Sequence, residues 1–143
     1  ITENAIDLAS KLGINRPNIA VLAPLEKVNP SIPSTVDAQI VASYEGYQNI
    51  GEIIGPVAMD IAMSKEAANH KNIDSPVCGN ADILIMPELA SGNILTKGLV
   101  FIAHLKSAGV LLGTTSPVIM TSRTDTIEDK YLSILTSIYC SLK

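Results

Sequence analysis

Residues Pro117–Lys130 combine side chains suited to binding an anion with side chains suited to starting a helix. An apolar run ends here in Thr-Ser-Arg, so that Arg123 lies at the predicted end of a strand and beside a helix N-terminus. A guanidinium in that place is a natural partner for phosphate or carboxylate. Two pairs of residues also have the spacing of a capping box, which is a purely structural role: Asp125 with Glu128, and Thr126 with Asp129. The residues alone leave both interpretations open.

The stretch Glu88–Asn93 is a second candidate anion site, between a predicted strand and a helix. Gly92 would let backbone N–H groups approach an anion there, whereas Ser91 or Asn93 would simply cap the helix. The overlapping SGNILTKG lacks the Gly-Lys-Ser/Thr ending of a P-loop, and no Gly-x-Gly-x-x-Gly follows a strand. Nucleotide hydrolysis and dinucleotide binding are therefore disfavoured.

Composition narrows the classes of partner. The 143 residues suit one compact domain, and 47% hydrophobic residues supply enough material for a core. A net charge of −4 disfavours nucleic acid, and the apolar stretches are shorter than the roughly 20 residues that span a bilayer. No cluster of His, Cys or carboxylate residues has metal-ligand spacing. We expect no metal, nucleic acid or membrane among the partners.

Two cysteines and two histidines receive structural interpretations. Cys78 and Cys140 lie far apart and are predicted to be buried free thiols in a reducing, cytoplasmic compartment. His70 is predicted to be a surface residue among lysines, and His104 a core residue of an apolar helix.

Helices and strands alternate along the chain. Amphipathic or capped segments predict helices over residues 2–13, 34–48, 64–72, 92–109 and 126–143. Thr2 is the expected N-cap of the first helix, Ser34 or Thr35 of the second, and Ser64 begins the third. Short apolar runs predict strands over residues 18–26, from 51 to a stop at Pro56, 81–88 with a stop at Pro87, and 109–122, the last with a break at Ser116-Pro117.

This alternation predicts an α/β fold, with a mostly parallel sheet between two helical layers. Because ligands bind beyond the carboxyl ends of such strands, four strand-to-loop junctions are candidate sites: LAPLEKVNP, GPVAMD, MPELASGN and MTSRTD. The last predicted helix has one apolar face, formed by Ile127, Tyr131, Ile134, Leu135, Ile138 and Leu142.

Three stretches resemble the phosphate acetyl/butyryltransferases, namely residues 1–35, 55–99 and 121–129. EKVNPSIPST and SKEAANHK favour the butyryl branch. The resemblance implies reversible transfer of a short acyl group between coenzyme A and inorganic phosphate, giving acyl phosphate and free coenzyme A. Coenzyme A would be a substrate, and no covalently bound cofactor is implied. It also implies an isocitrate/isopropylmalate dehydrogenase-like fold, a cleft between two α/β/α domains, and a homodimer.

The resemblance also implies a division of the chain and its site residues. Residues 1–121 would be the second α/β/α domain, and residues 122–143 a catalytic loop and a helix that packs on a first domain. Asp129 would take the thiol proton of coenzyme A, Arg123 would neutralise phosphate or the thiolate, and Ser122 would hydrogen-bond the intermediate. Weaker candidates in the same cleft bind substrate or coenzyme A: Asp60, Gly92 and Asn93.

The acidity of an aspartate and three departures from the family pattern bear on these implied roles. An ordinary aspartate, with a pKa of about 3.9, deprotonates a thiol of pKa about 8.5 only at a cost of about 6 kcal/mol. Burial would raise the aspartate pKa, while a helix N-terminus would lower it and leave more of the work to Arg123. Thr124 also stands where the family usually has glycine, Cys78 where alanine is usual and Ile54 where aspartate is common. The alternative function is a truncated, non-catalytic domain that binds coenzyme A or an anion, or dimerises.

Overall fold

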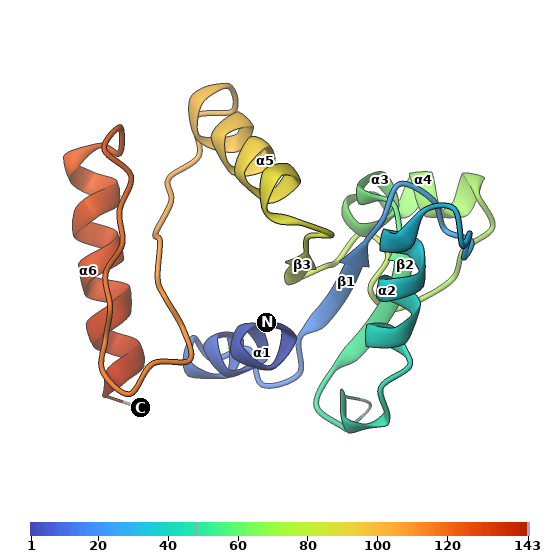
Figure 1. Ribbon diagram of the computed structural model, residues 1–143, viewed down its shortest axis with the longest axis horizontal. Coiled ribbons are helices and arrows are strands. Elements are labelled where there is room, and N and C mark those ends of the chain that lie inside the picture. The colour runs from blue at the N-terminus through green and yellow to red at the C-terminus, as the bar shows by residue number, and fades with distance from the viewer. Residues whose placement is uncertain (48, 143) are drawn as a thin grey trace.

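Three short strands form a parallel sheet in the order β2-β1-β3 (Figure 1). The strands are β1 (Asn18–Leu22), β2 (Glu52–Val57) and β3 (Ile83–Ile85). They belong to a computed structural model that describes residues 1–47 and 49–142. Ile19 of the central strand pairs with Ile53 on one side and Ile83 on the other. A fully buried strand flanked by two parallel neighbours explains why this segment is a continuous apolar run.

The sheet is covered on both faces, as predicted for a three-layer α/β/α arrangement. Ala20 and Leu22 of β1 pack with residues of α3 and α4 in one core cluster. Val21 and Ala23 point to the opposite face and pack with α2 in a second cluster. The covering helices are α2 (Pro33–Ala42), α3 (Met59–Met63) and α4 (Lys65–His70).

Helix ends follow the sequence signals only in part. The first helix, α1 (Thr2–Lys11), stops before Gly13, whose φ of +96° is the left-handed conformation that glycine adopts readily. Its N-cap, however, is Ile1, and the predicted cap Thr2 is buried inside the first turn. Helix α4 begins directly after Ser64, close to the predicted start, and the Ser64 hydroxyl caps it by accepting a hydrogen bond from Ala67 N at 3.2 Å.

The start of α2 also differs from the prediction. Pro33 takes the first helical position and Ile32 is the N-cap, in place of Ser34 or Thr35. The Thr35 hydroxyl is fully buried and instead donates to the carbonyl groups of Asn29 and Ile32. The helix ends at Ala42 and is followed by a 3-10 helix over Glu45–Tyr47, while Gln48, the last residue of the predicted helix, lies outside the described residues.

Pro56 does not end β2, which continues to Val57. The prediction was wrong because β2 is an outer strand of this sheet, where a residue without an N–H can be tolerated. The register between β1 and β2 shifts between Ala20 and Leu22, next to this proline.

The segment after β3 departs most from the prediction. Helix α5 (Leu89–Phe101) begins earlier and ends eight residues before Gly109, where it was predicted to stop. His104 therefore lies outside the helix, is exposed and has a φ of +56°. Residues 109–122 form no strand of the sheet. They turn at Gly113, whose φ is +82°, and pair with themselves through one antiparallel bridge between Leu111 and Val118.

The last helix, α6 (Ile127–Ser141), forms as predicted but packs on its other face. Figure 1 shows it standing apart from the sheet, joined to α5 by a long extended segment. Its buried residues are Asp129, Ser133, Ser137 and Cys140. The predicted apolar face is exposed to between 41% (Ile134) and 89% (Ile127). Lys143, the last residue of the predicted helix, is not among the described residues.

Cys78 and Cys140 are both free and buried, as predicted, while the compartment stays a prediction. His70 is exposed, also as predicted. In the part of the chain that the structure describes, no helix has the length and apolar character needed to cross a membrane.

Replacing a core residue of the covered sheet tests this packing. Ile61 of α3 is fully buried, so Ile61→Ala removes buried methyl and methylene groups and leaves a cavity. We expect a loss of about 2–5 kcal/mol in the free energy of unfolding, measured by urea denaturation. The matched control is Ile40→Ala on α2, where the side chain is 65% exposed and the loss should stay below about 1 kcal/mol. Equal losses at the two positions would contradict the described core.

Candidate active site

A tight turn over residues 122–125 presents the Ser-Arg pair. Asp125 N donates to the Ser122 carbonyl at 3.2 Å, and Ser122 N donates to the Asp125 carboxylate at 2.6 Å. Arg123 and Thr124 therefore occupy the corner of a turn that is closed from both sides. Arg123 is exposed, and among the residues that the structure describes its guanidinium has no hydrogen-bond or ion-pair partner. Its five donors are available to an anion.

The Ser122 hydroxyl lies between two other polar groups. Lys97 Nζ, from α5, donates to Ser122 Oγ at 3.2 Å, and Thr124 Oγ1 lies 3.0 Å from the same oxygen. The cation of Lys97 also lies 5.6 Å from the centroid of the Phe101 ring. One positively charged side chain, Lys97, thus contacts the serine hydroxyl, and a second, Arg123, is the next residue in the same turn.

Asp129 is the buried carboxylate of this region and is only 5% exposed. One oxygen accepts from Ser107 N at 2.9 Å, and the other accepts from Thr126 Oγ1 at 2.6 Å. Thr126 in turn caps α6, because its hydroxyl accepts from Asp129 N at 3.1 Å. Of the two predicted capping pairs, Thr126 with Asp129 is therefore the one that forms, and Asp125 closes the preceding turn instead.

Hydrogen bonds decide the acidity of Asp129. The backbone hydrogen bond from Ser107, followed by the one from Thr126, lowers the pKa of this carboxyl below its ordinary value despite burial. Hydrogen bonding thus exceeds burial, and its largest part comes from Ser107 in the segment after α5, ahead of the helix start at Thr126. Asp129 is consequently a weaker base than an ordinary aspartate.

Glu128 and Ser133 complete the attachment of α6 to the extended segment. Glu128 forms an ion pair with Lys106. Ser133 Oγ accepts from Gly109 N at 3.0 Å and donates to the carbonyl of Asp129 at 2.8 Å. The polar face of α6 is therefore its packing face.

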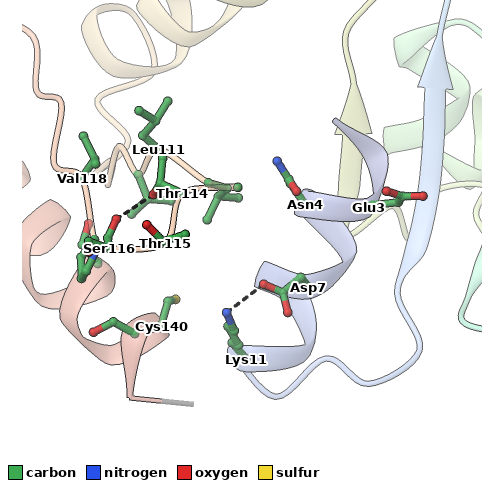
Figure 2. Close-up of a pocket in the computed structure, with 16 residues that line it drawn as sticks. Glu3, Asn4, Asp7, Lys11, Leu111, Thr114, Thr115, Ser116, Val118 and Cys140 are labelled. Atoms are coloured by element: carbon green, nitrogen blue, oxygen red, sulfur yellow. Dashed lines mark hydrogen bonds and ion pairs between the residues drawn. The ribbon is translucent and has the colours of Figure 1, made fainter.

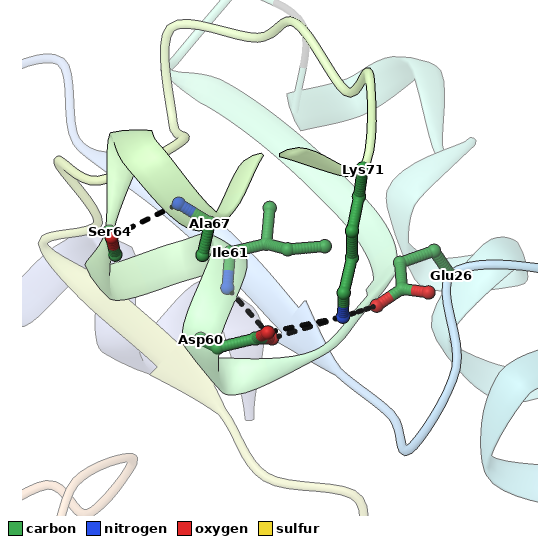
Figure 3. Close-up of polar contacts among 6 residues, drawn as sticks. All are labelled: Glu26, Asp60, Ile61, Ser64, Ala67 and Lys71. Carbon is green, nitrogen blue, oxygen red and sulfur yellow. Dashed lines mark hydrogen bonds and ion pairs between the residues drawn. The ribbon is translucent and has the colours of Figure 1, made fainter. Parts of the chain in front are cut away.

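Asp60 belongs to a separate network at the carboxyl ends of β1 and β2 (Figure 3). Its carboxylate pairs with Lys71 at 3.1 Å, and the same lysine pairs with Glu26 at 2.8 Å. The hydrogen bond from Lys71 is the main cause of a lowered Asp60 pKa, and the two carboxylates raise the pKa of Lys71. Two of the predicted junctions do meet here. No hydrogen bond or ion pair among the described residues connects this network to Ser122.

Gly92 and Asn93 lie in the first turns of α5, whose cap was not predicted. Glu88 caps this helix, in place of Ser91 or Asn93, by accepting from Ala90 N at 2.9 Å and from Ser91 N at 2.8 Å. These two hydrogen bonds lower the Glu88 pKa. A carboxylate of the chain itself thus occupies the helix N-terminus that was considered for an external anion.

A cavity of about 470 Å³ lies between α1, residues 110–118 and the end of α6 (Figure 2). Figure 2 shows the ion pair of Asp7 and Lys11 on its α1 side, and Cys140 on its α6 side. None of the six predicted site residues lines it. Within the described ranges, no group of three or more His, Cys, Asp or Glu side chains is arranged to hold a metal ion.

Comparison with known proteins places the chain in a family. The model of the family described as phosphate acetyl/butaryl transferase matches residues 1–138. The chain belongs to this family. The fold agrees, because a branched-chain phosphotransacylase from Enterococcus faecalis V583 matches with a TM-score of 0.89 and 40% identity, over 99% of this chain and 51% of that one.

Butyryltransferases and acetyltransferases of the family are similar to this chain at nearly equal sequence identity. A phosphate butyryltransferase of Clostridium acetobutylicum is 40% identical over 94% of this chain and 45% of its own length. A phosphate acetyltransferase of Thermotoga maritima is 44% identical over 94% of this chain and 47% of its own. The chain thus spans about half the length of the curated relatives it matches. The preference for the butyryl branch stays a prediction, because both branches match comparably.

Sequence reasoning missed Lys97 and Ser107. Lys97 lies 25 positions before Ser122 and on another element, so no local spacing could connect them. Ser107 contributes a backbone N–H, which leaves no signal in the side-chain pattern. The four-residue spacing of Lys97 and Phe101 on a helix was the one available hint of an ordered lysine.

The lowered pKa of Asp129 predicts a dependence of stability on pH. Because its folded pKa lies below the ordinary 3.8, this carboxylate stabilises the fold above that pH, and the contribution disappears as pH falls through the folded pKa. We expect Asp129→Asn to lower the free energy of unfolding at neutral pH, and the difference from the unsubstituted chain to shrink below about pH 4.

Urea denaturation at a series of pH values measures this difference. Asp37→Asn, which changes an exposed aspartate of α2, is the control and should show no such narrowing. A gap for Asp129→Asn that stays constant through the acid range would contradict the role of the charge.

Proposed function

We propose that this chain forms the cleft-lining and coenzyme-A-binding part of an acyltransferase that moves a butyryl or similar short acyl group between coenzyme A and inorganic phosphate. The observation that carries the proposal is the turn at Ser122-Arg123, in which a serine hydroxyl bonded to Lys97 is followed directly by an arginine with an exposed side chain. Membership of the phosphate acetyl/butaryl transferase family supports the same reaction.

The proposed roles follow from charge and position. Arg123 binds phosphate, or the thiolate of coenzyme A, because its guanidinium is exposed at the corner of the turn. Ser122 donates a hydrogen bond to the oxygen of the tetrahedral intermediate. Asp129 accepts the thiol proton, and because its pKa is lowered the nearby cations must stabilise the thiolate for this transfer to proceed.

The remaining site residues are proposed to contact the substrate more peripherally. Gly92 and Asn93 lie on the same helix as Lys97, which contacts Ser122. Asp60 lies in the first turn of α3, just beyond β2, and would reach the substrate through the carboxyl edge of the sheet.

We also propose a cytoplasmic location and a homodimeric assembly. Buried free thiols at Cys78 and Cys140 fit a reducing, cytoplasmic compartment. A homodimer fits the exposed apolar face of α6, which has Ile134 and Leu135 at its centre. Sedimentation analysis measures the assembly state directly.

A non-catalytic domain that binds coenzyme A or an anion, or that dimerises, is the second candidate. It is compatible with the exposed guanidinium of Arg123, which can bind an anion whether or not a reaction follows. Isothermal titration with coenzyme A separates the possibilities, because binding without turnover supports the non-catalytic function. Turnover supports the acyltransferase.

The assay for the first candidate mixes butyryl-CoA, phosphate and the longest polypeptide that the gene encodes, and follows the release of free thiol. Arg123→Ala should lower kcat/KM by about a hundredfold, because one cation is lost from the anion site. Arg16→Ala removes an exposed arginine that pairs with Glu52 at 2.8 Å and should leave the rate unchanged. Absence of thiol release by the unsubstituted protein refutes the enzymatic function.

A further inference from the structure

Lys97 is held in place by contacts at two sides of its ammonium group. The Nζ atom donates to Ser122 Oγ at 3.2 Å, across 25 residues of sequence. The same atom lies 5.6 Å from the centroid of the Phe101 ring, one turn further along α5. An ammonium over an aromatic face gains electrostatic stabilisation, so the lysine is ordered before any ligand arrives.

The direction of the hydrogen bond determines what Ser122 can do. An ammonium group donates only, so Ser122 Oγ must be the acceptor. The hydroxyl proton of Ser122 is then left for another partner. Thr124 N also donates to Ser122 Oγ, at 3.4 Å, so both lone pairs of this oxygen are used. Thr124 Oγ1, at 3.0 Å, then accepts the Ser122 proton until an anionic oxygen takes its place. A hydroxyl whose oxygen accepts from a cation becomes a stronger donor, because hydrogen bonds in a chain polarise one another.

The contact also connects two parts of the site. Among the described residues, Lys97 with Ser122 is the side-chain hydrogen bond that joins α5 to the turn over residues 122–125. Helix α5 starts directly after β3, where Glu88 caps it. Lys97 therefore fixes the position of the Ser122 hydroxyl relative to the helix that follows β3, in the turn that also carries Arg123.

We infer that Lys97 is a positioning residue of the acyl-transfer site, which orients the Ser122 hydroxyl so that its proton is donated to the anionic oxygen of the reaction. The inference rests on the proposed function and adds a residue to it. Lys97 acts on the reaction through Ser122. Its loss should therefore affect kcat more than the KM for either substrate.

A double-mutant cycle tests this action in the longest polypeptide that the gene encodes, with butyryl-CoA and phosphate as substrates and free thiol as the signal. Lys97→Met keeps the aliphatic stem and removes the donor, and it should lower kcat about tenfold. In the Ser122→Ala background the same change should cost less than about twofold, since the oxygen that Lys97 orients is gone. KM for both substrates should stay within about twofold.

Two further variants separate a local role from a general loss of folding. Lys97→Arg keeps a charged donor and should recover kcat to within about threefold of the unsubstituted protein. Lys65→Met removes an exposed lysine of α4 that bonds Asp74 at 3.1 Å, and it should leave kcat unchanged.

The outcomes distinguish the inference from the proposed function. An unsubstituted protein that releases no thiol refutes the proposed function, and the inference falls with it. An active protein in which Lys97→Met costs nothing refutes the inference alone. The inference is also wrong if Lys97→Met costs the same with and without Ser122, or if Lys97→Arg is as impaired as Lys97→Met.

Discussion

The buried carboxylate of Asp129 holds together the part of the molecule in which the candidate site lies. Its two oxygens accept from Ser107 and Thr126, and so join the extended segment after α5 to the first turn of α6. A buried carboxylate without such donors would be strongly unfavourable. The fold must therefore keep Ser107 and Thr126 within hydrogen-bond distance of Asp129. The turn that carries Ser122 and Arg123 directly precedes this attachment and is positioned by it.

In this arrangement the carboxylate of Asp129 has a structural role, whereas the cations of Arg123 and Lys97 are placed where they can act on a ligand. The negative charge of Asp129 is committed to hydrogen bonds that lower its pKa. The positive charge of Arg123 is exposed at the corner of the turn, and that of Lys97 is placed on Ser122. In the proposed acyl transfer, these cations would carry more of the electrostatic stabilisation than the base. Asp60, Lys71 and Glu26 form a second, separate charged group at the edge of the sheet, in which one lysine pairs with two carboxylates.

Predictions from sequence succeeded where local pattern and tertiary environment agree. The apolar run after Asn18 became the central strand, α4 began next to Ser64, and Gly13 ended α1. The predictions failed where an apolar run could form either a strand of the sheet or an extended segment that pairs elsewhere. Residues 109–122 look like a buried strand, yet they turn at Gly113 and pair with themselves. A short apolar run specifies extended backbone, but its pairing partner depends on the rest of the fold.

The sequence by itself determined the alternating α/β order, the family, and the Ser122-Arg123 turn with a helix start behind it, because capping signals, buried strands and motifs are local properties. Only the tertiary structure decided which face of α6 is buried. The apolar stripe predicts a helix, but hydrogen bonds from Ser107 and Gly109 to Asp129 and Ser133 place the polar face inward. It also brought Lys97 to Ser122, since a contact between distant residues requires the chain to be folded.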